Sequence, residues 1–249
     1  MSNWKLKTKN GVKYFKFYLD YERLQCLFIT KIGGLNFPSE NPKLMQENLN
    51  QIEKNFGIKQ INILKQTHSD RFFYVPEDFK FNYSLEGDGL FTDQTSIYLG
   101  IRVADCLPIY LFSQSKRIIG IVHSGWKGTL QEIGKKIVLK MMGRFNLKST
   151  EINFAFGPSI GACCYEINKD LALVFKEFAK ARDVIHAVTE RGNKYFLDLK
   201  SINEKILENT GVQKAGSIDL CSFCDKDLLF SARRNDLNNR NLALIGFHK

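Results

Sequence analysis

The chain has 249 residues, of which 44% are hydrophobic, so it can form one large domain or two small ones around a sizeable core. Its formal net charge of +10 admits nucleic acid, acidic lipid or a phosphorylated small molecule as a partner. Much of the excess charge lies near the N-terminus, and no predicted helix carries a stripe of Lys and Arg interleaved with aromatic residues. This pattern argues against nucleic acid as a partner.

The sequence also bears on location and on the use of cysteine. It has no apolar run of about 18 uncharged residues, and its N-terminus lacks the apolar core of a signal peptide. We therefore expect a cytoplasmic protein with no membrane partner. Six cysteines are too few for a disulfide scaffold, so they should be free thiols, metal ligands or nucleophiles.

The first third of the chain predicts strands and one helix. Residues 12–32 contain two β-rich runs that end at the turn signal Gly33-Gly34. A helical pattern begins at Pro42 and ends at Gly57, a C-cap position, and residues 61–75 then read as strand, polar break and strand, with His68 in the break. The apolar face of the helix consists of Leu44, Met45, Leu49, Ile52 and Phe56.

Two polar motifs come next. Gly87-Asp88-Gly89 predicts a tight turn, with Asp88 as a turn residue. Residues 96–106 predict a strand in which Arg102 and Asp105 stand among apolar neighbours. That arrangement is costly unless the charges are paired or lie near a site.

The centre of the chain predicts a β-hairpin. Two apolar runs within residues 109–122 flank the polar segment Ser113–Lys116, and a loop centred on that segment pairs Cys106 with His123. Directly opposed residues have Cβ atoms about 5 Å apart, which suits either a shared metal or a Cys/His catalytic pair. Pro108 cannot donate to the ladder, so it predicts a bulge or fraying of the Cys106 strand.

A helix should follow His123 over residues 125–145, with its N-terminus placed to favour an anion. Residues 152–161 predict a strand, residues 167–182 and 197–211 predict amphipathic helices, and residues 242–247 predict a buried strand. The apolar face of the first helix consists of Leu130, Ile133, Ile137, Val138 and Met141, and the expected N-terminal caps of the last are Asp198 and Ser201.

Four further cysteines remain. Adjacent cysteines cannot easily bind one tetrahedral metal together, and the CxxC has no second CxxC at zinc-ribbon spacing. We therefore expect small buried side chains rather than a zinc site. These residues are Cys163, Cys164, Cys221 and Cys224.

His68, Cys106 and His123 each lie where an apolar strand ends, which is where sites usually form. Three ligands of mixed N and S leave a zinc ion one open position, the arrangement of a catalytic zinc. A metal-free alternative makes Cys106 a nucleophile and His123 its base, with Asp105 or another acceptor orienting the ring, but it gives His68 no role. A non-catalytic zinc-binding module does not explain the open position.

Taken together, the motifs resemble those of the laccase-domain, YfiH-like family of zinc-dependent purine nucleoside phosphorylases, formerly called multicopper polyphenol oxidases. They follow the family's order from about residue 20 to 247, and the combination of ADCLP with HSGWKG is highly specific. The matching motifs are QTHS at 66–69, GDG with FTD at 87–93, ADCLP at 104–108, VHSGWKG at 122–128, GPSIGACCYE at 157–166, LDL at 197–199, and CxxC followed by FSARR at 221–234.

The resemblance implies one α+β domain over residues 1–249, with mixed β-sheets packed against helices and a zinc ion bound by His68, Cys106 and His123. It also implies phosphorolysis of adenosine, inosine, guanosine and methylthioadenosine, with adenosine deaminase activity. The family often has HAGWRG where this chain has HSGWKG, so Ser124 and Lys127 depart from the common motif. Asn235 lies where an acidic residue is common in the family. These departures bear on substrate preference.

The substrates would then be purine nucleosides and inorganic phosphate. Phosphorolysis requires a grip on phosphate and stabilisation of the departing purine. A carboxylate, Asp105 or Asp88, should move the proton in deamination. The candidate anion contacts are Arg71, Lys127, Arg233 and Arg234.

Copper oxidase chemistry is an alternative function. A multicopper centre needs roughly ten His ligands, whereas this chain has 4. A lone copper bound by two His and one Cys remains compatible with the ligand set.

Overall fold

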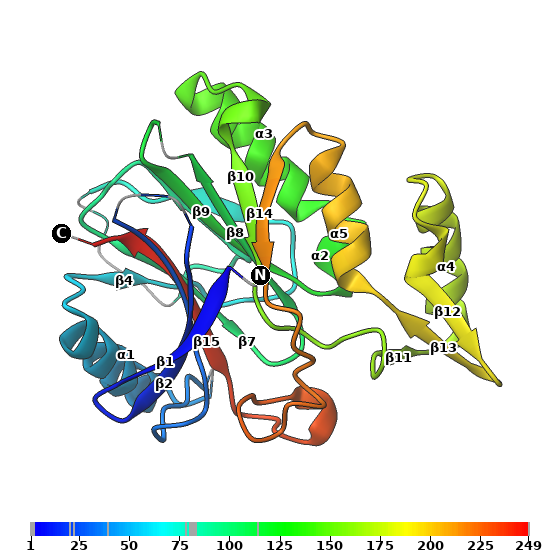
Figure 1. The fold of residues 1–249 in the computed structure, drawn as a ribbon, viewed down its shortest axis with the longest axis horizontal. Helices are drawn as coiled ribbons and strands as arrows, with labels where there is room; N and C mark the ends of the chain where they lie inside the picture. The colour runs from blue at the N-terminus through cyan, green and yellow to red at the C-terminus, as the bar shows by residue number, and fades with distance from the viewer. Residues whose placement is uncertain are drawn as a thin grey trace.

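The computed structural model describes residues 3–19, 21, 23–38, 40–77, 79, 84–113 and 115–248. Two six-stranded sheets pack face to face, helices cover their outer faces, and a small three-stranded sheet projects at one side (Figure 1). The predicted α+β class is confirmed. That all of the chain forms a single domain stays a prediction.

The first sheet pairs the N-terminal strands with the C-terminal strand, and helix α1 (Pro42–Phe56) covers its outer face. Asn41 accepts a hydrogen bond from the Leu44 N–H at the start of α1, and Gly57 ends the helix at φ 67°. The predicted apolar face is buried except at Leu44, which is exposed. In spatial order the strands are β1 (Trp4–Lys9), β2 (Val12–Phe17), β3 (Leu24–Ile29), β15 (Asn241–Phe247), β7 (Tyr98–Val103) and β4 (Ile61–Asn62).

The second sheet carries the central hairpin and is covered on both faces. Side chains alternate along a strand, so Tyr110 packs between the two sheets while Ile109 and Leu111 pack under the helices. This double burial explains the continuous apolar runs of the hairpin. In spatial order the strands are β14 (Gln213–Ser217), β10 (Asn153–Phe156), β8 (Leu107–Ser113), β9 (Ile118–Ser124), β6 (Gly89–Thr92) and β5 (Phe72–Tyr74).

The hairpin register differs from the predicted one. Ile109 pairs with Val122 instead of Gly120, because the turn is centred one residue further along the chain than predicted, so that Ser113 pairs with Ile118. Gln114, in the predicted loop, lies outside the described residues.

This shift removes the predicted pairing of Cys106 with His123. Pro108 pairs with His123 without a bulge, and Cys106 lies outside the strand, just before β8 begins at Leu107, as the alternative of fraying predicted. The proximity of thiol and imidazole therefore does not come from direct cross-strand pairing.

The helix predicted after His123 is interrupted. Helix α2 (Trp126–Leu130) and helix α3 (Ile133–Phe145) are separated at Glu132, whose φ is 54°. The Glu132 carboxylate is held by Arg182 at 2.8 Å, a contact between distant segments that no local pattern shows. The predicted apolar face is buried except at Leu130, which is half-buried.

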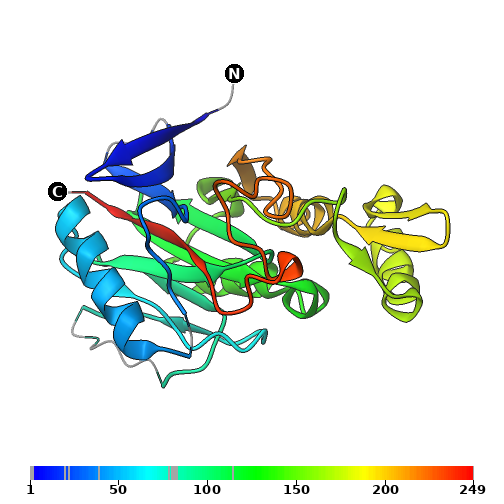
Figure 2. The ribbon, with the colours of Figure 1, turned by 90° about the horizontal axis from the view of Figure 1, so that it is seen from below.

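The projecting part contains strands β11 (Glu166–Ile167), β13 (Lys194–Leu197) and β12 (Val188–Arg191) with helix α4 (Lys169–Lys180). Figure 2 shows it on the opposite side of the molecule from α1. Helix α5 (Leu199–Glu208) connects it to the second sheet. The short 3₁₀ helices are η1 (Ser149–Glu151), η2 (Ile185–Ala187) and η3 (Ala232–Arg234).

The N-terminus of α5 partly follows the prediction. Asp198 caps the helix by accepting the Ser201 N–H at 3.1 Å, whereas Ser201 lies inside the first turn. Within the described ranges, no helix is long and apolar enough to cross a membrane.

Candidate functional site

The predicted ligands converge. One ligand atom from each of His68, Cys106 and His123 lies within 4.8 Å of the others. His68 lies in the segment between β4 and β5, Cys106 lies between β7 and β8, and His123 lies near the end of β9. The three side chains, which we call the His–Cys–His site, therefore come from two connections between strands and from the end of a third segment, strand β9.

Two residues at the site have backbone angles that side-chain-bearing residues seldom adopt. His68 has φ 58° and Asp105 has φ 91°. Such angles cost about 1–3 kcal/mol each and persist where surrounding contacts enforce them. The His68 N–H donates to Asp88 at 3.1 Å, and the Asp105 carboxylate accepts from the Arg233 N–H at 2.7 Å. The tertiary structure thus holds both residues in place.

Asp88 orients the ligands and is not a simple turn residue. Its fully buried carboxylate lies 2.8 Å from Nδ1 of His123 and also accepts the N–H groups of His68 and Ser69. With Nδ1 engaged, Nε2 of His123 is the nitrogen available to a metal, as in carboxylate–histidine–metal arrangements. The expectation of a turn aspartate was wrong because the backbone around it carries the carboxylate into the interior.

The charges favour the metal-binding form of the thiol. Burial alone would raise the pKa of Cys106, but the imidazoles of His123 and His68 outweigh burial and lower that pKa to about 6. Burial opposes the charge on His123, but the Cys106 thiolate and Asp88 raise the His123 pKa to about 9. For Asp88, burial is likewise opposed by His123 and Ser69, which lower its pKa to about 2.

Gly125 makes room for the His–Cys–His site. A Cβ at this position would lie 2.9 Å from Sγ of Cys106 and 3.3 Å from Cδ2 of His68. Ordinary carbon contacts begin near 3.5 Å, so any side chain here would push the ligands apart. The glycine of the HSGWKG motif is therefore explained by close approach.

The site opens into a cavity of about 580 Å³. His68, Cys106 and His123 line it together with three arginines and Asp105, so anionic groups find an excess of positive charge beside the ligands. Nothing in the sequence alone indicated that Gln66 or Arg240 lies in the cavity wall, because a single amide or a single arginine does not by itself indicate a binding site. The remaining lining residues are Gln66, Arg102, Ala104, Asp105, Ala232, Arg233 and Arg240.

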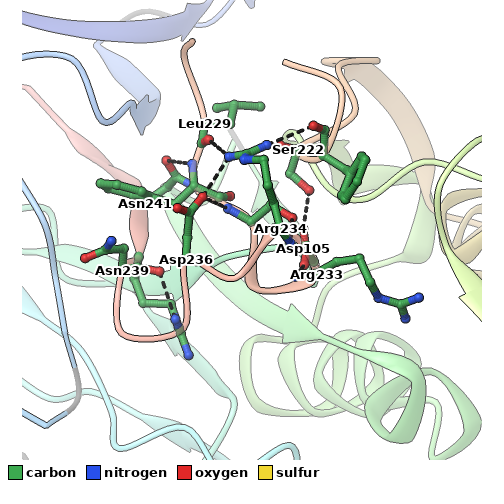
Figure 3. Close-up of polar contacts among 12 residues, drawn as sticks. Asp105, Ser222, Leu229, Arg233, Arg234, Asp236, Asn239 and Asn241 are labelled. Atoms are coloured by element: carbon green, nitrogen blue, oxygen red, sulfur yellow. Dashed lines mark hydrogen bonds and ion pairs between the residues drawn. The ribbon is translucent and has the colours of Figure 1, made fainter. Parts of the chain in front are cut away.

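The cavity wall near Asp105 is built by the loop that carries the predicted arginine pair. Asp105 accepts the Ser222 hydroxyl at 2.6 Å and the Arg233 N–H at 2.7 Å. Figure 3 shows Arg234 turned into the loop while Arg233 points away from it. Arg234 donates to the Ser222 carbonyl at 2.8 Å and pairs with Asp236 at 2.8 Å. The two arginines therefore have different surroundings.

Two other predicted anion contacts lie elsewhere. Arg71 pairs with Glu86 at 3.0 Å, and the Lys127 ammonium lies 5.5 Å from the Trp126 ring centre. Neither is among the described residues that line the cavity. Helix α2 has only 5 residues, so its N-terminus offers a weaker dipole than the long helix expected there.

A second group of thiols also converges, contrary to expectation. These residues, which we call the four-cysteine cluster, have Sγ atoms within 4.8 Å of one another: Cys163, Cys164, Cys221 and Cys224. They lie in the two loops that follow β10 and β14, so only the tertiary structure brings the adjacent pair to the CxxC. The prediction of four small buried side chains is wrong, because Cys163 and Cys224 are exposed.

Comparisons with known proteins agree with this architecture. A family model described as multi-copper polyphenol oxidoreductase laccase matches residues 33–248. A protein of Borreliella burgdorferi named purine nucleoside phosphorylase is 36% identical over 235 residues, covering 92% of this chain and 94% of its own. A protein from an unknown prokaryotic organism, named adenosine deaminase RL5, is 33% identical over 187 residues, 70% of each chain.

A solved structure shows the same fold. The crystal structure of the hypothetical protein YfiH from Bacillus licheniformis superposes with a TM-score of 0.87 at 25% identity, covering 98% of this chain and 99% of that one. The resemblance read from the motifs is therefore confirmed, and the chain belongs to the YfiH-like family whose model is described as multi-copper polyphenol oxidoreductase laccase.

Proposed function

We propose that the protein is a zinc-dependent purine nucleoside phosphorylase that also deaminates adenosine. The observation that carries this proposal is a three-ligand His–Cys–His site, with His123 oriented by a buried carboxylate, at a cavity lined by three arginines. The names of the relatives from Borreliella burgdorferi and of RL5 support the same two activities. The proposed nucleosides are inosine, guanosine, adenosine and methylthioadenosine.

The donor set fits zinc, because two imidazoles and one thiolate are ligands that zinc accepts and they leave one position open. Bound zinc supplies Lewis acidity and activates water near neutral pH. The protein's own part is to hold the ligands. Asp88 fixes the His123 ring and the His68 backbone together, so that two of the three ligands share one buried anchor.

Phosphorolysis joins phosphate to C1′ of the sugar as the bond from C1′ to the purine breaks. Inosine and phosphate then give hypoxanthine and ribose 1-phosphate. The Arg233 side chain lies at the cavity wall and is our candidate for phosphate binding. Among the described residues, its guanidinium donates one hydrogen bond, to the Glu166 carbonyl at 2.9 Å, whereas the Arg234 guanidinium is held by several groups of its own loop. Adenosine and water give inosine and ammonia, a reaction that does not use phosphate.

Of the two carboxylates proposed to move a proton, Asp105 is the better candidate. Asp105 lines the cavity, whereas Asp88 is fully buried behind His123 and is not among the described residues that line it. The Ser222 hydroxyl and the Arg233 N–H fix the Asp105 carboxylate at the wall. We therefore assign the proton transfer of deamination to Asp105.

The metal-free thiol hydrolase is a weaker reading of the same residues. It uses Cys106 and His123 but gives no reason for His68 to lie within 4.8 Å of both. A copper oxidase would use the same three ligands with a different metal. Metal analysis of protein purified without added metal separates these alternatives.

The test combines products with metal content. Wild-type protein should release hypoxanthine and ribose 1-phosphate from inosine only when phosphate is present, and should form inosine from adenosine without phosphate. His68→Ala should lose the zinc of this site and both activities together. His186→Ala is the matched control, because His186 is exposed in η2, away from the cavity. Inosine cleavage that ran equally well without phosphate would refute the phosphorylase assignment.

The phosphate contact has its own test. Arg233→Gln should raise KM for phosphate about tenfold or more while Lys127→Gln leaves it unchanged, because Arg233 lines the cavity and Lys127 does not. An unchanged phosphate KM in Arg233→Gln would assign phosphate binding to another cation of the wall.

A further inference from the structure

We propose that the four-cysteine cluster binds a second zinc ion, with a structural role separate from the His–Cys–His site. Sγ of Cys224 lies 3.8 Å from Sγ of Cys163 and 3.3 Å from Sγ of Cys164. A tetrahedral zinc with bonds of about 2.3 Å places its sulfurs about 3.8 Å apart. A disulfide would need about 2.05 Å, so the spacing matches a metal site more closely than a cross-link.

The adjacent cysteines can reach one ion because their backbone turns sharply. The N–H groups of Cys164 and Tyr165 both donate to the Gly161 carbonyl at 2.9 Å, which folds residues 161–165 into a tight turn. Both sulfurs of the pair then approach Cys224. The objection that adjacent cysteines cannot share a tetrahedral ion assumes an extended backbone, and the backbone here is not extended.

One backbone group supports a sulfur of the cluster. The Gly161 N–H donates to Sγ of Cys221 at 3.3 Å, a contact of the kind that supports metal-bound sulfur. A Cβ on Gly161 would lie only 3.2 Å from Sγ of Cys163, so the glycine leaves space beside the sulfurs.

An arginine side chain is hydrogen-bonded to each of the two loops that carry the cysteines. Four thiolates around one zinc carry a formal charge of about −2, which nearby positive groups can offset. Arg191 donates to the Ala162 carbonyl at 3.1 Å, and Arg234 donates to the Ser222 and Phe223 carbonyls at 2.8 Å. Each loop therefore carries a guanidinium beside its cysteines.

The position of the cluster defines its role. It connects the loop after β10 to the loop after β14, which are also joined by the Ser222 N–H to the Ser159 carbonyl at 3.0 Å. The second loop continues to Ser222 and Arg233, which hold Asp105 at the cavity wall. Four protein ligands leave zinc no open position, so this ion fastens the wall and takes no part in the chemistry.

Metal content tests the proposal directly. Wild-type protein should hold about two zinc ions per chain, and Cys221→Ser/Cys224→Ser should hold about one. Cys106→Ser should also hold about one zinc ion per chain, because it should lose the zinc of the His–Cys–His site and keep the zinc of the four-cysteine cluster. With cobalt in place of zinc, Cys106→Ser should keep the intense thiolate charge-transfer absorption and the double variant should lose most of it. Cys26→Ala, a buried thiol remote from both groups, is the control and should match wild type.

Activity and stability separate this role from a catalytic one. The double variant should keep kcat while KM for nucleoside rises several-fold and the melting temperature falls. An unchanged melting temperature, or loss of kcat equal to that of Cys106→Ser, would overturn the structural role. Either result leaves the proposed function intact, because that function is tested through His68 and phosphate.

Thiol labelling of wild-type protein needs no variant. With zinc bound, the four thiols should resist iodoacetamide under native conditions, and a strong chelator should make them reactive. Three results would each refute a zinc site here. The first is rapid labelling of the exposed Cys163 and Cys224 without chelator. The others are disulfide bonds, seen before reduction as a mass lower by two hydrogens for each disulfide, and iron found in place of zinc.

Discussion

The molecule carries two groups of metal-ligand side chains that are built in opposite ways. The His–Cys–His site takes its ligands from two strand connections and from the end of strand β9, and its supporting carboxylate, Asp88, is fully buried. The four-cysteine cluster takes its ligands from two loops, and Cys163 and Cys224 are exposed. The His–Cys–His site faces a cavity of about 580 Å³, whereas, in the part of the chain that the structure describes, none of the four cysteines of the cluster lines that cavity.

Two features distinguish a reactive metal site from a structural one. Both groups have ligand atoms within 4.8 Å, so proximity alone does not separate them. The number of protein ligands and the access to a cavity do: three ligands leave an open position for substrate, and four close the coordination sphere. In the proposed roles, zinc would take part in the reaction at the His–Cys–His site and would stabilise the structure at the four-cysteine cluster.

The largest expected effect comes from removing metal in two stages. A mild chelator should take zinc first from the His–Cys–His site, because that site has one protein ligand fewer and an open coordination position that a chelator can enter. Activity should fall to background while the melting temperature changes little, and about one equivalent of zinc should restore it. Loss of the fold before loss of activity would reverse the assignment of the two groups.

Asp88→Asn should have the next largest effect. Losing the carboxylate that orients His123 should weaken zinc binding by about 10–100-fold. Asp198→Asn is the control, because an amide can still cap α5. Zinc affinity measured by competition with a chromophoric chelator reports the change.

The pH dependence of this variant follows from the lowered pKa of Asp88, about 2. A carboxyl whose folded pKa is depressed contributes stability above its unfolded pKa, near 4, and loses that contribution as the pH falls through about 2. Asp88 therefore stays ionised between about pH 5 and 8. Because Asp88 also raises the pKa of the ligand His123, protons compete with zinc more strongly in the wild type, and the ratio of wild-type to Asp88→Asn zinc affinity should rise as the pH increases from about 5 to 8. A ratio that fell over this range would contradict this role of Asp88.

Much of the fold could be predicted from local pattern. The helix beginning at Pro42 and the strand at residues 242–247 follow from apolar spacing and turn residues. The break at Glu132 could not be predicted, because Arg182, which holds it, is 50 residues away in sequence. The predicted hairpin pairing was wrong by two residues, because an apolar pattern does not fix the position at which the turn is centred.

The site was predicted in its ligands but not in its supports. His68, Cys106 and His123 have side chains whose chemistry is visible in a sequence, whereas the role of Asp88 depends on backbone that carries it inside. Gly125 matters through a Cβ it lacks, which only packing reveals. The convergence of the four cysteines was not expected, because adjacent cysteines on an extended backbone cannot easily share one ion and the CxxC has no second CxxC at zinc-ribbon spacing.

A smaller effect is expected from Gly125→Ala. Its Cβ would lie 2.9 Å from Sγ of Cys106, so the thiol must shift, and zinc affinity should fall about tenfold. Gly143→Ala is the matched control, since nothing lies within 4 Å of a Cβ added there, in helix α3. The control should keep its zinc and gain up to about 1 kcal/mol in free energy of unfolding. Full zinc affinity in Gly125→Ala would show that the thiol can move freely.

The smallest effect tests the connection between the two groups. Ser222→Ala removes one hydroxyl that donates to Asp105 at 2.6 Å and leaves the cysteines in place. A hydrogen bond of this kind contributes about 0.5–1.5 kcal/mol, so nucleoside KM should rise between about two- and tenfold with zinc content unchanged. Ser201→Ala is the control, because its hydroxyl donates to Asp198 at 2.7 Å, on a carboxylate outside the cavity. Both variants lose a hydroxyl–carboxylate bond and should lose similar stability, but only Ser222→Ala should alter KM. Equal KM values in the two variants would mean that the loop after β14 does not transmit its position to the cavity through Asp105.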